Sequence, residues 1–244
     1  MEALAPRFHV LAADSYGAGK SPGWPMDWPL RLCDEVALLE PVLACAGDPC
    51  ALVAHSYGAA VALIAAITQR RRVCALALYE PTLFALLDAE SPPPNDADGI
   101  RDTVERSVAA LDVGDPARAA RCFIDYWMGS GTWDRLAESR KGPIVASINN
   151  IRGWANALLR EPTPLQVFTE LDIPVLYMIG KNSPASSRGV ARLLTRALPR
   201  VEVVEFNGLG HMGPVTNPEI VNEAISSFLE GAKSSFQRIA CGGR

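Results

Sequence analysis

Short, almost continuously apolar runs alternate with amphipathic segments along most of the chain. Such runs are typical of parallel strands that are buried on both faces, and the segments between them have helical spacing. We expect strands at residues 8–14, 49–55, 71–81, 173–180 and 201–206, and flanking helices at residues 28–47 and 218–231. This alternation predicts an α/β fold with a mostly parallel sheet and helices beside it.

One long region interrupts this alternation. From Thr82 to Leu171 only helical patterns occur, at residues 99–111, 115–129 and 141–159, and a proline-rich stretch at residues 89–96 marks where the region begins. We therefore predict a helical cap at 82–171, inserted between two core strands and flanked by core segments at 1–81 and 172–244. Its tryptophans, Trp127, Trp133 and Trp154, are expected in the interior of the cap, with the wall of a pocket as the alternative.

Composition and charge narrow the possible partners. With 244 residues, 49% of them hydrophobic, the chain can bury a full core. The net charge of −4, with acids and bases interspersed, excludes a basic surface for nucleic acid or an anionic membrane. The sequence contains neither a membrane-spanning apolar stretch nor a signal-peptide pattern, which predicts a cytoplasmic protein with small-molecule partners. The oligomeric state stays open.

The six cysteines are scattered along the chain without the spacing of metal ligands. Reduced thiols are therefore expected rather than disulfides or a zinc site. We predict no metal and no cofactor.

The pentapeptide Ala-His-Ser-Tyr-Gly, residues 54–58, places Ser56 between a predicted strand and a predicted helix. A serine at such a sharp turn is exposed as a nucleophile, and Ala54 and Gly58 are small enough for the turn. The helix that follows directs its positive end and the Tyr57 amide at the serine, where they can stabilise an oxyanion. The alternative is that Ser56 only caps the helix. His55 is expected to line the pocket.

His211 lies in the glycine-rich loop Asn207–Pro218, after the last predicted strand and before the last helix. With the serine turn ahead of it, this arrangement resembles the α/β-hydrolase family, as do residues 10–25 and the strand 173–180. The resemblance covers nearly the whole chain, with the helical insertion at the position of the family's cap. It implies that Ser56 attacks a carbonyl and that His211 acts as its base. Tyr57, His55 and Met212 are the candidates for oxyanion or substrate binding.

The acidic residue that would hold the imidazole of His211 is not at the family's usual place. There the chain has Lys-Asn-Ser-Pro-Ala-Ser-Ser, with Ser183 in the position of the frequent aspartate. Asp172 lies at the wrong end of its strand, since catalytic groups gather at the carboxyl ends of parallel strands. Glu80 ends the strand next to that of the nucleophile, where some capped relatives carry their acid. We expect it to hold His211, the alternative being a structural role in its own loop.

The resemblance also implies strands and a His-Gly oxyanion loop ahead of residue 1. We therefore expect an N-terminally shortened version of the family, with a sheet that re-pairs or has a gap and with weakened activity. Two functions remain: a serine hydrolase of small, largely apolar carbonyl compounds, or a catalytically impaired hydrolase-fold protein that binds a small molecule or a partner.

Overall fold

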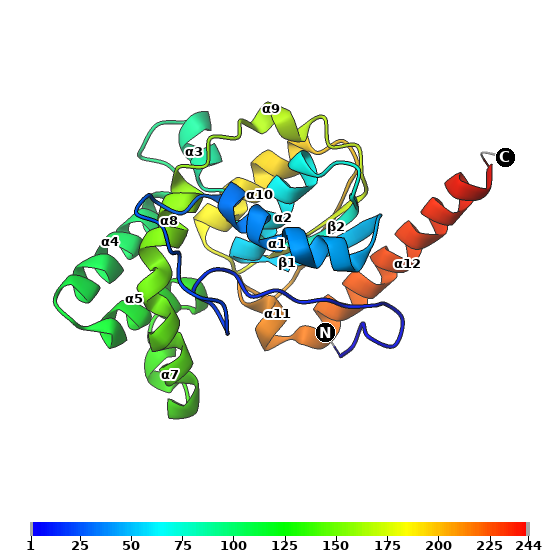
Figure 1. The fold of residues 1–244 in the computed structure, drawn as a ribbon. Coiled ribbons are helices and arrows are strands. Elements are labelled where there is room, and N and C mark those ends of the chain that lie inside the picture. The colour runs from blue at the N-terminus through cyan, green and yellow to red at the C-terminus, as the bar shows by residue number, and fades with distance from the viewer. Residues whose placement is uncertain (1, 243–244) are drawn as a thin grey trace.

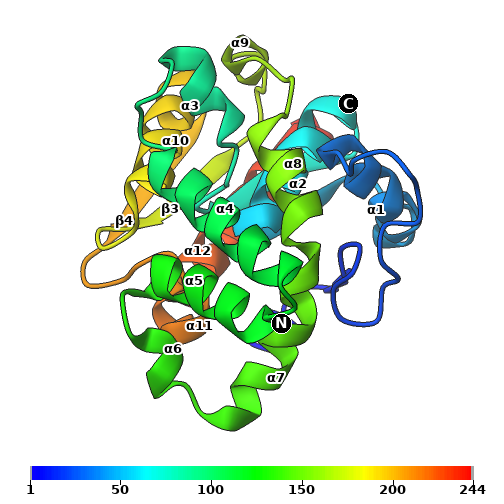
Figure 2. The same ribbon diagram turned by 90° about the vertical axis from the view of Figure 1, so that its left-hand side faces the viewer.

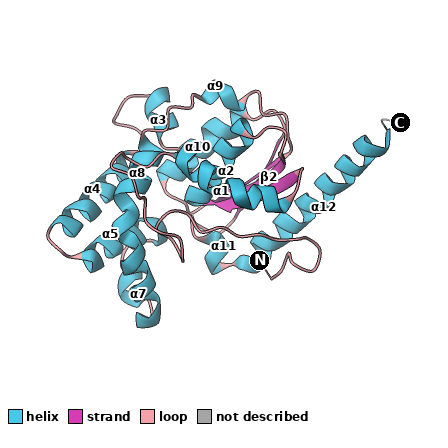
Figure 3. Ribbon diagram, viewed as in Figure 1, coloured by secondary structure: helices cyan, strands magenta, loops and turns pink. Residues whose placement is uncertain are grey.

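A computed structural model describes residues 2–242, with side chains described through residue 232. Its centre is a four-stranded sheet made of β1 (Cys50–His55), β2 (Val73–Tyr79), β3 (Val175–Gly180) and β4 (Val201–Phe206). The strands lie in the order β1-β2-β3-β4 and all three pairings are parallel (Figures 1 and 3). The predicted α/β class and parallel sheet are confirmed.

Helices cover both faces of this sheet. Alternate residues of β2 and β3, such as Leu76 and Tyr177, pack with α2 (Ser56–Thr68) and α10 (Ala185–Ala197) in the main core. The residues between them, such as Ala77 and Met178, face a second cluster that includes Val221 and Ile225 of the last helix. Because successive side chains of a strand point to opposite faces, the two clusters form one layer on each side of the sheet. The last helix, α12 (Pro218–Gly242), starts close to the carboxyl edge of the sheet (Figure 1).

The predicted helical insertion forms between β2 and β3, where the described residues contain no strand. It consists of α3 (Ala85–Glu90), α4 (Asp98–Asp112), α5 (Pro116–Met128), α6 (Thr132–Arg135), α7 (Glu138–Ser147), the 3-10 turn η1 (Ile148–Asn150), α8 (Ile151–Leu159) and α9 (Leu165–Phe168). Helix α4 packs against both α5 and α8 in front of the sheet (Figure 2). A small core of its own, including Trp133 and Ile148, holds the insertion together. Its exact limits as a cap, 82–171, stay a prediction.

One predicted strand is wrong. Residues 8–14 form no strand, and β1 pairs only with β2 within the described part of the chain. The apolar side chains of Phe8 and Val10 pack instead against the cluster that α12 shares with the sheet. Val53 of β1 is accordingly 43% exposed. Phe8 and Val10 are thus partly buried on this cluster, while Leu11 stays exposed, and the backbone of the segment finds no strand to pair with among the described residues.

The remaining flanking helices agree with the sequence pattern. Helix α1 (Leu32–Ala46) ends before Gly47, whose φ of 83° is a conformation that glycine adopts without strain. The short helix α11 (Gly213–Thr216) follows the loop that carries His211. None of the helices in the described residues is long and apolar enough to cross a membrane.

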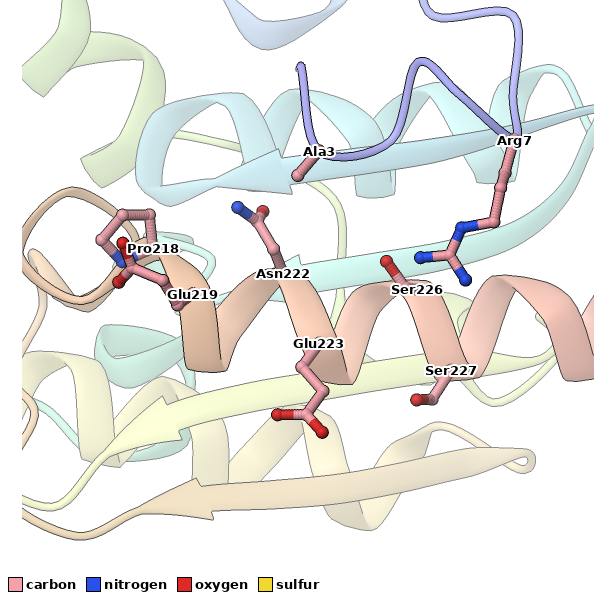
Figure 4. Close-up of a pocket in the computed structure, with 8 residues that line it drawn as sticks. All are labelled: Ala3, Arg7, Pro218, Glu219, Asn222, Glu223, Ser226 and Ser227. Carbon is pink, nitrogen blue, oxygen red and sulfur yellow. The ribbon is translucent and has the colours of Figure 1, made fainter.

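An open hollow of about 470 Å³ lies between the N-terminal segment and the first turns of α12 (Figure 4). Most of the residues that line it are of polar or charged type, including Arg7, Asn222 and Ser226. Arg7 pairs there with Glu230 across the surface. Neither Ser56 nor His211 lines this hollow, so it is separate from the site described below.

Candidate active site

Ser56 stands at the turn between β1 and α2, where the sequence pattern places it. Its φ is 55°, a left-handed backbone conformation that non-glycine residues rarely adopt. Such strain persists only where the surrounding structure holds it, and it is frequent at functional sites. The turn presents the Ser56 hydroxyl at the carboxyl edge of the sheet.

Three residues that are far apart in the sequence form one hydrogen-bonded chain at this edge. The Nε2 atom of His211 lies 2.8 Å from Ser56 Oγ, and its Nδ1 atom lies 2.7 Å from Glu80 Oε2. Because a carboxylate only accepts, Nδ1 donates to Glu80, which leaves Nε2 free to accept the proton of Ser56. His211 and Glu80 are buried, at 2% and 0% exposed.

Glu80 is held by more than the histidine. It follows β2 with a φ of 47°, and its second oxygen, Oε1, accepts from the Gly180 N–H at 2.8 Å and from Ser183 Oγ at 2.5 Å. Burial alone would raise the pKa of Glu80, but its hydrogen bonds, first that from His211, hold the pKa below its ordinary value. The carboxyl group is therefore ionised at neutral pH in spite of its burial.

The His55 side chain contacts the backbone of the loop that carries His211. Its Nε2 atom lies 2.8 Å from the backbone oxygen of His211, and since a carbonyl only accepts, Nε2 must carry the proton. Burial, followed by the neighbouring His211, lowers the pKa of His55 to about 4. This side chain is therefore a neutral donor at physiological pH.

Tyr57 is the second residue of α2 and lies in its first turn, where amides have no acceptor within the helix. Its amide is thus free to point at the region beside Ser56. The Tyr57 hydroxyl donates to Glu35 Oε1 at 3.0 Å, which ties α2 to α1. Burial raises the pKa of Glu35 even though the hydrogen bonds from Tyr16 and Tyr57 act in the opposite direction.

A small cavity of about 60 Å³ opens beside Ser56, under the helical insertion. Its walls are almost entirely apolar and contain no charged side chain among the described residues. The lining consists of Ser56, Tyr57, Thr82, Phe84, Ile100, Val104, Phe123, Trp127, Ile151, Trp154, Ala155, Leu158 and Leu159. A molecule in this cavity would meet Ser56 at one end and mostly apolar walls elsewhere.

Trp127 of α5 lies on the imidazole ring of His211. The two ring centroids are 3.8 Å apart and the planes are inclined by only 26°. Trp133 lies in the core of the insertion as expected, Trp127 is buried in the main core and also lines the cavity, and Trp154 lines the cavity. The pattern of the insertion contained no signal for this contact, because it depends on how the helices pack over the sheet.

The structure brings Ser56, His211 and Glu80 together but keeps two other predicted residues outside the cavity lining. His55 lies behind the loop of His211, as described above, and Met212 packs against the main core. Sequence reasoning missed the roles of Gly180 and Ser183 beside Glu80. The one signal in the sequence was that Ser183 occupies the family's usual acid position, which could have indicated that this residue contacts Glu80.

The described residues contain no group of three or more His, Cys, Asp or Glu side chains that could hold a metal ion. The cysteines with described side chains are free thiols, namely Cys33, Cys45, Cys50, Cys74 and Cys122. Cys241 lies outside the residues whose side chains are described.

Comparison with known proteins gives a consistent result. A model of the alpha/beta hydrolase family matches residues 1–224. The chain is 30% identical over 239 residues to lipase LipV of Mycobacterium tuberculosis, covering 92% of this chain and 84% of that protein. A hydrolase from Pseudomonas aeruginosa PA01 has a similar structure, with a TM-score of 0.73, 23% identity and coverage of 93% and 82% of the two chains. An esterase from Thermogutta terrifontis is also similar in structure, with a TM-score of 0.69 and 22% identity, and the match covers 95% of this chain and 83% of that protein.

Proposed function

Because this chain belongs to the alpha/beta hydrolase family, we propose that it is a serine hydrolase of small, largely apolar carboxylic esters or related acyl compounds. The observation that carries the proposal is the hydrogen-bonded chain from Ser56 through His211 to Glu80. The names of two related proteins, a lipase and an esterase, support an ester as the bond that is cleaved. A cytoplasmic location is part of the same proposal.

In the proposed reaction, Ser56 Oγ attacks the ester carbonyl carbon while its proton passes to Nε2 of His211. The negative charge on the carbonyl oxygen would be stabilised by the Tyr57 amide and the positive end of α2. His211 then donates its proton to the departing alcohol oxygen, which leaves an acyl group on Ser56. Water, deprotonated by His211, releases the acid and restores the serine. Glu80 keeps the histidine in the tautomer that these steps need.

The cavity favours short substrates. At about 60 Å³ it is well below the roughly 300–1,000 Å³ of ordinary ligand pockets. A short apolar group fits such a space, whereas a long chain would have to displace Trp127 or Phe84. We therefore expect the highest kcat/KM with p-nitrophenyl esters of about two to four acyl carbons.

A fluorophosphonate probe tests the proposal most directly, since it reacts only with an activated serine. The wild-type protein should be labelled and Ser56→Ala should not, while both unfold at the same temperature. The same pair is then compared with p-nitrophenyl esters of increasing acyl length. Turnover that survives Ser56→Ala contradicts the proposal. Absence of both labelling and turnover in the wild type favours the alternative, a hydrolase-fold protein that only binds its ligand.

A further inference from the structure

Two polar atoms in the wall of the cavity have no hydrogen-bond partner. The Thr82 hydroxyl and the Trp154 indole N–H are fully buried, and neither finds an acceptor or donor among the described residues. Both residues line the otherwise apolar cavity beside Ser56. A buried polar group without a partner costs free energy, so its retention in a native protein requires an explanation.

The positions of the two residues point to a ligand. Thr82 comes two residues after Glu80, at the carboxyl edge of the sheet, and is only 1% exposed. Trp154 belongs to α8, and its ring centroid is 6.1 Å from that of Tyr57, the residue that follows the nucleophile. They therefore approach the cavity from two sides, one from the core and one from the insertion.

We propose that Thr82 and Trp154 bind a neutral oxygen of the substrate, an ether, hydroxyl or keto group in the part that enters the cavity. This inference rests on the proposed esterase function and specifies its substrate class. Both atoms can donate a hydrogen bond, so an acceptor is the partner that satisfies both. The acceptor is neutral, because the lining has no cationic side chain to pair with a carboxylate or phosphate.

The cavity should distinguish an ester that carries this oxygen from a hydrocarbon ester of the same length more strongly than an entirely apolar cavity would. An apolar pocket discriminates weakly between chains of equal length, whereas a site with donors to satisfy rejects the analogue that lacks the acceptor. The substrate class is therefore a short ester with an oxygen substituent, rather than a plain fatty-acid ester.

The test replaces one methylene of a short ester by an ether oxygen, at successive positions, in two series. In the first series the acyl group changes, and in the second the alcohol changes. Each oxygenated ester is compared with its hydrocarbon counterpart in the wild type, Thr82→Val and Trp154→Phe. Thr82→Val keeps the shape of the side chain and removes only the hydroxyl, whereas Trp154→Phe keeps an aromatic ring but removes the N–H donor together with part of the indole. For each protein, the preference is the kcat/KM for the oxygenated ester divided by the kcat/KM for its hydrocarbon counterpart. Dividing the preference of a variant by that of the wild type cancels the different intrinsic reactivity of the two esters.

We expect the preference for an oxygenated ester over its hydrocarbon counterpart to fall about tenfold in both variants, in at least one series. Thr103→Val is the matched control: Thr103 is also buried, but its hydroxyl donates to the Gly99 carbonyl at 2.8 Å and does not line the cavity. It should leave the preference unchanged. An unchanged preference in Thr82→Val and Trp154→Phe across both series overturns the inference.

Stability provides a readout that does not depend on turnover. If the Thr82 hydroxyl lacks a partner in the free protein, Thr82→Val should raise the urea midpoint of unfolding, whereas Thr103→Val should not. A midpoint that falls in Thr82→Val means that the hydroxyl is already satisfied, and this overturns the inference. If the wild type hydrolyses no ester, the proposed function fails. The urea midpoints of Thr82→Val and Thr103→Val still show whether the Thr82 hydroxyl lacks a hydrogen-bond partner in the free protein.

Discussion

Ser56 and Glu80 share an unusual backbone conformation and follow the ends of two paired strands. Among the residues that the structure describes, they are the only non-glycine residues with positive φ, at 55° and 47°. The residues before them, His55 and Tyr79, are direct partners in the register of β1 and β2. The parallel pairing thus places the proposed nucleophile and the proposed acid side by side, with His211 joined to both.

Glu80→Gln tests whether this carboxylate is the acid of the triad. The amide keeps the size of the side chain but no longer fixes the tautomer of His211 or stabilises its charged form. We expect kcat to fall by about a hundred- to ten-thousand-fold while KM and the unfolding temperature change little. Steady-state kinetics with a short p-nitrophenyl ester measures both constants.

Ser183→Ala is the control for this experiment. It removes one hydrogen bond to Glu80 Oε1 and leaves the contact between Oε2 and His211 in place. Its effect on kcat should stay within about tenfold. If Glu80→Gln keeps more than about a third of the wild-type rate, a loss below roughly 0.7 kcal/mol, Glu80 is not the acid.

Trp127 should stabilise the charged form of His211. Its indole is stacked on the imidazole at 3.8 Å, and a cation over an aromatic face gains about 0.5–2 kcal/mol. Trp127→Leu should therefore lower kcat by about 2- to 30-fold for an acetate ester, which is too short to depend on the apolar wall. Trp127→Phe should restore most of this loss, because it keeps an aromatic face. Equal rates in Trp127→Leu and the wild type would rule out this role.

The residues of the proposed triad could be picked out from the sequence because they lie at the ends of patterned elements. Ser56 follows an apolar strand and begins a helix, His211 occupies the loop after the last strand, and Glu80 ends the strand that neighbours the nucleophile. Parallel pairing of β1 and β2 places Ser56 and Glu80 side by side, and the loop after β4 carries His211 to them along the same carboxyl edge of the sheet.

Other features depend on packing that no local pattern specifies. The apolar run at residues 8–14 has the composition of a strand, but a strand also needs a partner with free backbone groups. Only Phe8 and Val10 of this run pack on the α12 cluster instead. Trp127 and Trp154 lie on helices whose sequence shows only an apolar face. Which of these aromatic side chains covers the site depends on how the insertion folds back over Ser56.

Two glycines near the site should respond in opposite ways to alanine. A Cβ atom on Gly180 would lie 2.4 Å from the backbone oxygen of Leu209, and the same glycine donates to Glu80. A Cβ atom on Gly58 would lie 4.0 Å from that of Ala54, an ordinary contact. Gly180→Ala should therefore shift the His211 loop, lower kcat at least tenfold and destabilise the fold by about 1–3 kcal/mol.

Gly58→Ala, in contrast, should keep activity within severalfold of the wild type and gain up to about 1 kcal/mol of stability, because alanine is the better helix former. Urea unfolding and ester hydrolysis measured on both variants provide the comparison. Equal destabilisation by the two substitutions would contradict the geometry described for these glycines.

His55 should make the fold sensitive to acid. Its pKa is lowered to about 4 in the folded protein, against about 6.5 when unfolded, so between these values the unfolded chain binds more protons. The contribution of this residue to stability is therefore complete above about pH 6.5 and is lost as the pH falls toward 4. One pKa unit corresponds to about 1.4 kcal/mol, so the full loss amounts to about 3 kcal/mol.

His55→Gln separates this effect from every other titration in the protein. Glutamine can still donate to the His211 carbonyl, but it does not gain a proton in this range. In urea unfolding from pH 7 down to pH 4.5, the wild type should lose about 2–3 kcal/mol more of its unfolding free energy than the variant. Between pH 7 and pH 6.5 the difference in unfolding free energy between the two proteins should hardly change. Parallel curves over the whole range would mean that His55 titrates normally and is not the buried neutral donor that supports the loop of His211.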